Sequence, residues 1–170
     1  MKLDDIKAST AYSYYIIEDI PDAAERLHHE MNKYTEWKFV GSARGVKQAI
    51  KQISEYKPTL IFCDWDLIGG SGFEILQHIQ NLNGYDPFII FNTGFQSDHP
   101  EIAEELINIY KTDAFMNKPY WHKLNEQLST LLQKAIAKSE KEKVRTKPVW
   151  LGDIHGKKYP VDPLEIICVL

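Results

Sequence analysis

The sequence is poor in cysteine, has no long apolar run and carries no excess of basic residues. Its two cysteines, Cys63 and Cys168, lie far apart in apolar stretches, a pattern that favours a reducing compartment over a disulfide framework. No stretch approaches the ~18 consecutive apolar residues of a membrane-spanning helix, and the acidic Asp4 and Asp5 are not typical of a signal peptide. We therefore expect a cytoplasmic protein with no membrane partner.

The composition also disfavours two classes of binding protein. A net charge of −4 and a pI near 5.9 give no overall attraction to nucleic acid, although local basic patches remain open. The six histidines lack the spacing of zinc ligands, and we interpret His28 and His29, adjacent on a predicted helix, as surface residues. Hydrophobic residues make up 44% of the 170, which is enough for one globular domain and a smaller addition.

Apolar runs of strand length alternate with amphipathic segments through most of the chain. Strands are predicted at 12–17, 37–43, 60–63, 87–92 and 114–117. Helices are predicted at 21–35, from Val46 to a stop at Lys57-Pro58, from Phe73 to Ile79, from Pro100 to Tyr110, and from Leu124 to Ala135. This alternation indicates βα units around a parallel sheet, which places the fold in the α/β class.

Polar side chains follow four of these strands. Glu18 and Asp19 follow the first strand, Asp64 the third, Thr93 the fourth and Lys118 the fifth. Because right-handed crossovers bring the carboxyl ends of parallel strands to one edge of the sheet, these residues should lie close together. The loop after Asp64 is rich in glycine, as a sharp turn at a binding crevice requires.

Three carboxylates at one point repel each other unless a cation lies between them. Oxygen ligands in an open site favour Mg²⁺. We expect Asp19 and Asp64 to be direct ligands, Glu18 to act through water or from a second layer, and Asp66 to offer its backbone carbonyl. The predicted cofactor is therefore Mg²⁺.

The same edge carries the groups that phosphoryl transfer needs. Lys118 can hold one oxygen of a transferring phosphoryl group, and Thr93 can hydrogen-bond another. Asp64 is then the nucleophile that attacks phosphorus and becomes an acyl phosphate. The plainer alternative is that Asp19 and Lys118 form only an ion pair that closes the sheet edge.

With these motifs, residues 12–137 resemble the CheY-like receiver domain of a bacterial two-component response regulator. The resemblance is carried by Glu18-Asp19 with Pro21, by Asp64-x-x-Leu-Ile-Gly-Gly-Ser-Gly, by Thr93-Gly94 and by Lys118-Pro119. It implies a doubly wound, five-stranded parallel sheet with five helices, of the flavodoxin-like order.

The resemblance also implies a function. Asp64 would accept phosphate from a sensor histidine kinase, and the protein would catalyse no reaction beyond its own phosphorylation and dephosphorylation. Phosphorylation would favour a homodimer. Phe115 would be the switch aromatic; the plainer alternative is that it is a core side chain.

The chain departs from the family pattern at three positions. Ile68 stands where the family usually has proline, Ser71 where aspartate is common, and Gly94 where alanine is common. None of these changes removes a chemical role, but they leave the rate and lifetime of phosphorylation open.

The two ends of the chain differ in composition from its centre. Residues 1–11 look like an extension, and 138–148 form a charged run typical of a solvated helix end or a linker. Residues 149–170 resemble the opening of a LytTR-type DNA-binding domain: an apolar strand, a Gly-Lys turn, a second strand and Leu-Glu-Ile-Ile. This short β fragment is an incomplete domain, so DNA binding would require the complete output domain.

Three functions follow from these patterns. The first is a phosphorylation-controlled transcription regulator with a LytTR-type output. The second is a Mg²⁺-dependent phosphohydrolase of the haloacid dehalogenase type, which Asp64-Trp65-Asp66 resembles, although that motif normally precedes its acid pair. The third is a stand-alone receiver that acts through protein contacts alone.

Overall fold

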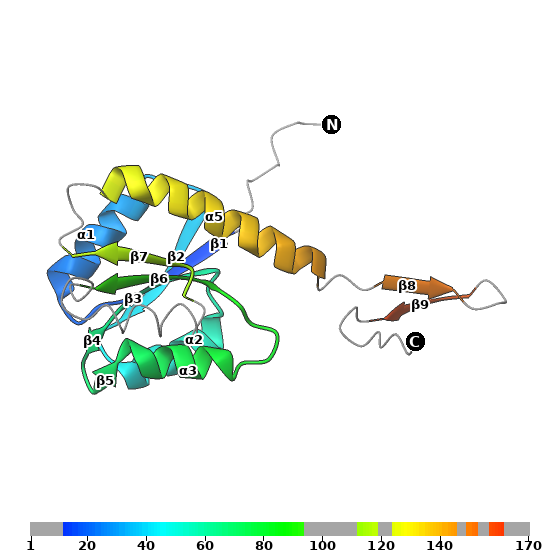
Figure 1. The fold of residues 1–170 in the computed structure, drawn as a ribbon, viewed down its shortest axis with the longest axis horizontal. Coiled ribbons are helices and arrows are strands. Elements are labelled where there is room, and N and C mark those ends of the chain that lie inside the picture. Colours follow the sequence, from blue (N-terminus) through cyan, green and yellow to red (C-terminus); the bar gives the residue numbers. More distant parts are fainter. Residues whose placement is uncertain (1–11, 94–111, 119–123, 146–148, 153–156, 162–170) are drawn as a thin grey trace, which may run out of the picture.

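The computed structural model describes residues 12–93, 112–118, 124–145, 149–152 and 157–161. Five strands form one sheet in the order β2-β1-β3-β6-β7, and every pair of neighbours is parallel (Figure 1). The strands are β1 (Tyr12–Ile17), β2 (Trp37–Ala43), β3 (Leu60–Asp64), β6 (Phe88–Thr93) and β7 (Ala114–Asn117). The predicted doubly wound α/β fold is confirmed.

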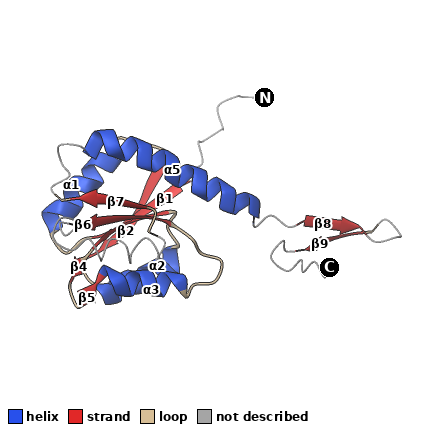
Figure 2. Ribbon diagram, in the orientation of Figure 1, coloured by secondary structure: helices blue, strands red, loops and turns tan. Residues whose placement is uncertain are grey.

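Four described helices cover the two faces of this sheet (Figure 2). Helices α1 (Pro21–Met31) and α5 (Leu124–Arg145) lie on one face, and α2 (Val46–Tyr56) and α3 (Gly72–Gln80) lie on the other. The predicted helix from Pro100 lies outside the described residues, as does the extension 1–11. None of the helices in the described part of the chain is both long and apolar enough to span a bilayer.

Alternate residues of β1 supply the two cores. Tyr14 and Ile16 belong to the cluster beneath α1 and α5, whereas Tyr15 and Ile17 belong to the cluster beneath α2 and α3. Successive side chains of a strand point to opposite faces, so a strand buried on both sides needs a continuous apolar run. All five residues of β3 are likewise buried. Burial of each aliphatic side chain stabilises the fold by about 1.5–3 kcal/mol.

Two predictions for the first helix need correction. The helix ends at Met31, not at residue 35, and the chain continues in tight turns in which the Tyr34 N–H donates to the Met31 carbonyl at 3.0 Å. Tyr34 lies beyond the helix but still packs on the core, which explains why it fits the helical spacing of the apolar residues before it. His28 is half-buried, not a surface residue, because its Nδ1 lies 2.8 Å from the hydroxyl of Tyr14.

The edge strand β2 contains a bulge. Tyr14 pairs with Phe39 and Tyr15 with Gly41, so Val40 has no partner in β1. Gly41 has a φ of +151°, which favours glycine, and a Cβ there would lie 3.0 Å from the Tyr15 ring.

Helix α5 is longer than its apolar pattern predicts. Leu128, Leu132 and Ala135 are buried, but the helix continues through the charged run as far as Arg145 (Figure 1). Beyond it, β8 (Val149–Gly152) and β9 (Lys158–Val161) form an antiparallel pair. The two strands predicted in this segment are therefore present.

Candidate functional site

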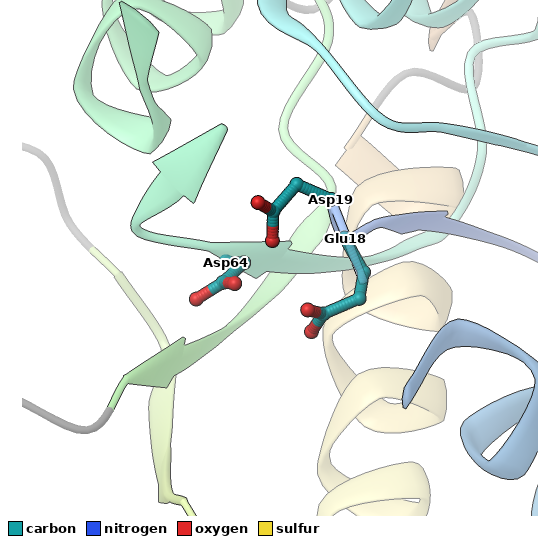
Figure 3. A group of neighbouring side chains, drawn as sticks. All are labelled: Glu18, Asp19 and Asp64. Carbon is teal, nitrogen blue, oxygen red and sulfur yellow. The ribbon is translucent and has the colours of Figure 1, made fainter. Parts of the chain in front are cut away.

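Three carboxylates meet at the carboxyl ends of β1 and β3 (Figure 3). Each of Glu18, Asp19 and Asp64 offers an oxygen, and these oxygens lie within 4.8 Å of one another. The register explains the meeting, because Ile17 pairs with Cys63 and the next residue of each strand carries an acid. Glu18 is 2% exposed and Asp64 6% exposed, so both acids are held in the crevice.

Lys118 follows β7 and reaches across to two of these acids. Its Nζ donates to Asp64 Oδ2 at 2.7 Å and to Glu18 Oε1 at 3.1 Å. Glu18 Oε2 lies 2.8 Å from the same nitrogen, but no hydrogen bond reaches it. Glu18 Oε2 is therefore a buried acceptor without a hydrogen bond, although the Lys118 ammonium lies beside it.

The electrostatics of the site follow from burial and from these contacts. Burial raises the pKa of Glu18 to about 7; Lys118 opposes this shift and the neighbouring Asp64 adds to it. Burial alone would lower the pKa of Lys118, but its hydrogen bonds to Asp64 and Glu18 outweigh that effect and raise it. The lysine is thus cationic, and it is the one ammonium group that contacts this cluster of three carboxyl groups among the described residues.

The donor set fits a hard divalent cation. All three candidate ligands are carboxylates, the type of ligand that Mg²⁺ and Ca²⁺ take, and no sulfur or imidazole joins the described cluster. Glu18 Oε2, a buried acceptor without a hydrogen bond, can be satisfied by a cation or by one of its waters. Oxygens within 4.8 Å of one another are close enough to share one ion.

The loop after β3 is held in a defined shape. β4 (Asp66–Leu67) pairs with β5 (Gly70–Ser71) as a small antiparallel ladder that the sequence did not predict. Gly72 must be glycine, since a Cβ there would lie 2.5 Å from the Asp64 carbonyl oxygen. Ser71 then caps α3 in a reciprocal capping box with Glu74.

The remaining predicted site residues occupy different surroundings. Thr93 ends β6, where it pairs with Asn117, but its side chain is outside the described set. Phe115 on β7 is half-buried, with its ring centroid 6.3 Å from that of Phe91. Asp66 is exposed, and its carbonyl as a metal ligand stays a prediction.

Sequence reasoning missed one residue at this edge. Arg44 follows β2, and its Nε donates to the Asp19 carbonyl at 2.9 Å. The only available signal was its position, because β2 ends at the same edge as β1 and β3.

Comparisons with known proteins agree with this geometry. The family model for the response regulator receiver domain matches residues 15–133. Two curated relatives are the sensory transduction protein LytT of Oceanobacillus iheyensis, 26% identical over 152 residues, and the transcriptional regulatory protein CitB of Klebsiella pneumoniae, 28% identical over 113 residues. These matches cover 89% and 66% of this chain but 59% and 47% of the relatives, so the chain spans about half their length.

Solved structures give the same fold. The response regulatory domain of mrkE from Klebsiella pneumoniae matches with a TM-score of 0.64 and 25% identity, covering 76% of this chain and 98% of that one. The response regulator domain of CheB from Thermotoga maritima matches with a TM-score of 0.65 and 19% identity, covering 73% and 96%.

Proposed function

This chain belongs to the response regulator receiver family, and on that premise we propose that Asp64 accepts a phosphoryl group from a sensor histidine kinase. The observation that carries the proposal is the contact of one lysine, Lys118, with both Asp64 and Glu18, beside Asp19. A nucleophile, a fixed cation and an acidic metal site in one crevice are the parts that phosphoryl transfer to a carboxylate requires.

In the proposed reaction a carboxylate oxygen of Asp64 attacks phosphorus. The new P–O bond forms as the bond from phosphorus to the donor breaks, and the product is an acyl phosphate. Lys118 is already bonded to Asp64 Oδ2 and would follow the phosphoryl group by donating to one of its oxygens. Thr93 would donate to another, as its position at the end of β6 suggests.

Glu18, Asp19 and Asp64 would hold Mg²⁺, with the Asp66 carbonyl as a further ligand. When bound, the ion would neutralise charge on the phosphoryl oxygens as they approach three acids. Glu18 can contribute through its free Oε2, directly or through water. Phe115, packed near Phe91 on β7, would be the aromatic that changes position with phosphorylation.

Phosphorylation can be tested by mass. Incubation with acetyl phosphate and Mg²⁺ should add ~80 Da to the parent protein, the mass of one phosphoryl group. Asp64→Asn should abolish the gain, whereas Asp22→Asn, an exposed acid in the first turn of α1, should retain it because the proposed reaction gives it no part. Undiminished phosphorylation of Asp64→Asn would refute the assignment.

The output proposed for this receiver is transcriptional control through a LytTR-type domain that begins at residue 149. The match to LytT of Oceanobacillus iheyensis covers 152 residues, more than the 119 residues (15–133) of the receiver family match, which favours a relationship beyond the receiver. The antiparallel pair β8–β9 would be the first two strands of such a domain. The family assignment favours a receiver over the phosphohydrolase. The resemblance of residues 149–170 to a LytTR-type domain favours an output over a receiver that acts alone.

DNA binding is proposed for the complete output domain and not for residues 1–170. A two-stranded ribbon buries too little apolar area to be stable alone. A gel shift with residues 1–170 near physiological salt should therefore give no sequence-specific complex; a specific complex would show that the short segment binds by itself.

Sedimentation with beryllofluoride, a phosphoryl mimic, should show stronger self-association of the chain, and unchanged profiles at high protein concentration would argue against dimerisation.

A further inference from the structure

The loop after β3 is bonded to the turn before α2 through backbone groups. The Ile68 N–H donates to the Arg44 carbonyl at 3.0 Å, and the Val46 N–H donates to the Ile68 carbonyl at 3.1 Å. The two chains approach so closely that a Cβ on Gly45 would lie 2.5 Å from the Ile68 carbonyl oxygen. The contact thus requires glycine at position 45.

It also requires a backbone N–H at position 68. Proline, which is usual at this position in the family, has no N–H and cannot donate to the Arg44 carbonyl. The Ile68 side chain is 55% exposed, so its burial does not explain the residue. What isoleucine provides in this chain is a hydrogen-bond donor between two loops of the site.

Arg44 connects the same turn to the acid pair. Its side-chain Nε donates to the Asp19 carbonyl at 2.9 Å, and the preceding residue, Ala43, accepts from the Glu18 N–H at 3.0 Å. Arg44 and Glu18 also line one cavity. Arg44 therefore uses its main chain toward the loop that follows Asp64 and its side chain toward the turn that carries Asp19.

From these contacts we infer that Arg44 is a positioning residue for the metal site, acting with the Ile68 N–H. Together they fix the distance between the turn that carries Asp19 and the loop that follows Asp64. Lys118 holds the carboxylates of Glu18 and Asp64, whereas Arg44 holds the backbone of the third acid. Because Arg44 bonds to the backbone carbonyl of Asp19, it orients this residue without pairing with its side-chain carboxylate.

This inference rests on the proposed Mg²⁺ site, so Mg²⁺ affinity is the quantity to measure. Isothermal titration of the full chain with MgCl₂ should show that Arg44→Ala binds the ion about tenfold more weakly than the parent. This is the lower end of the loss expected when a residue that orients a metal ligand is removed. Arg44→Lys keeps a donor and should recover most of the affinity. Lys47→Ala removes the same charge from an exposed position on α2 and should match the parent.

The backbone part is tested by Ile68→Pro against Ile68→Val. Proline removes the N–H and should weaken Mg²⁺ binding, whereas valine keeps it and should not. Because the two hydrogen bonds are successive links in one connection between Asp19 and the loop after Asp64, Arg44→Ala combined with Ile68→Pro should lose less affinity than the two single losses predict. Circular dichroism of each variant would establish that the fold is intact.

The outcomes separate the two proposals. If the parent does not bind Mg²⁺, the proposed function fails and the inference fails with it. If the parent binds but Arg44→Ala binds equally well, or Lys47→Ala loses as much, the role of Arg44 is refuted while the metal site stands. Additive losses in the double variant would refute the view that the two hydrogen bonds act as one connection.

Discussion

Lys138 on α5 donates to both carboxylate oxygens of Asp113, the residue before β7, each at 3.0 Å. The same Nζ donates to the Pro87 carbonyl at 2.9 Å and lies 2.8 Å from Asp86. Asp113 also accepts from the Ile89 N–H at 2.8 Å, so one lysine joins α5 to the amino ends of β6 and β7. The charged run is therefore attached to the receiver where it begins.

Lys138→Met should lower the free energy of unfolding by roughly 1–3 kcal/mol, because it leaves Asp113 without its cation. Burial already raises the pKa of Asp113, so its charge depends on this partner. Urea denaturation measures the change. Lys141→Met, an exposed site on the same helix, is the matched control and should stay within about 0.5 kcal/mol of the parent. Equal stabilities for both variants would show that the contact contributes nothing.

Tyr14 should make the fold sensitive to alkali. Burial raises the pKa of this 1% exposed phenol from 10.0 to about 12. Its contribution to stability is thus complete below pH 10 and is lost as the pH rises toward 12, because the unfolded chain ionises first. By linkage the loss is about 1.4 kcal/mol at pH 11.

Urea denaturation at pH 8 and pH 11 tests this with Tyr14→Phe. The variant loses its contact with His28 at both pH values. Between pH 8 and pH 11, however, its free energy of unfolding should fall by about 1.4 kcal/mol less than that of the parent. Parallel drops in parent and variant would mean that Tyr14 ionises as easily in the fold as outside it.

Trp65 should report binding at the acidic site. Its backbone N–H donates to Asp64 Oδ1 at 2.7 Å, and the centroid of its ring lies 6.0 Å from that of Phe91. Its emission should change on addition of Mg²⁺ and again with beryllofluoride. The chain has four tryptophans, so Trp65→Phe is the control, and an unchanged titration signal in that variant would assign the response elsewhere.

Gly72→Ala should slow phosphorylation as well as destabilise the fold. The added Cβ would lie 2.5 Å from the Asp64 carbonyl oxygen and 2.6 Å from the Phe91 ring, so Asp64, the proposed nucleophile, must shift. We expect a cost of about 1–3 kcal/mol and a lower rate of mass gain with acetyl phosphate. Gly69→Ala meets no atom within 4 Å and strains only its own backbone, at φ +80°, so it should keep the parental rate. Equal rates for the two variants would contradict this view of Gly72.

The sequence predicts the sheet and the acidic cluster because their signals are local. Apolar runs such as 60–63 end in the acids, and parallel order then brings Asp64 to Glu18 and Asp19. The contacts of Arg44 and Lys138 are not predictable in this way. Each depends on backbone carbonyls or acids from distant segments, and a charged residue in a solvated run looks the same whether or not it has such partners.

The bulge in β2 limits how copies of this protein can associate. An exposed sheet edge is a template for a strand of another chain, which pairs through a regular series of N–H and C=O groups. Val40 interrupts the regular pairing of β2 with β1 and bends the strand at its centre, so at this edge another molecule would find no straight template for adding a strand. Self-association that uses this side of the domain should therefore proceed through side chains and leave the sheet at its own five strands.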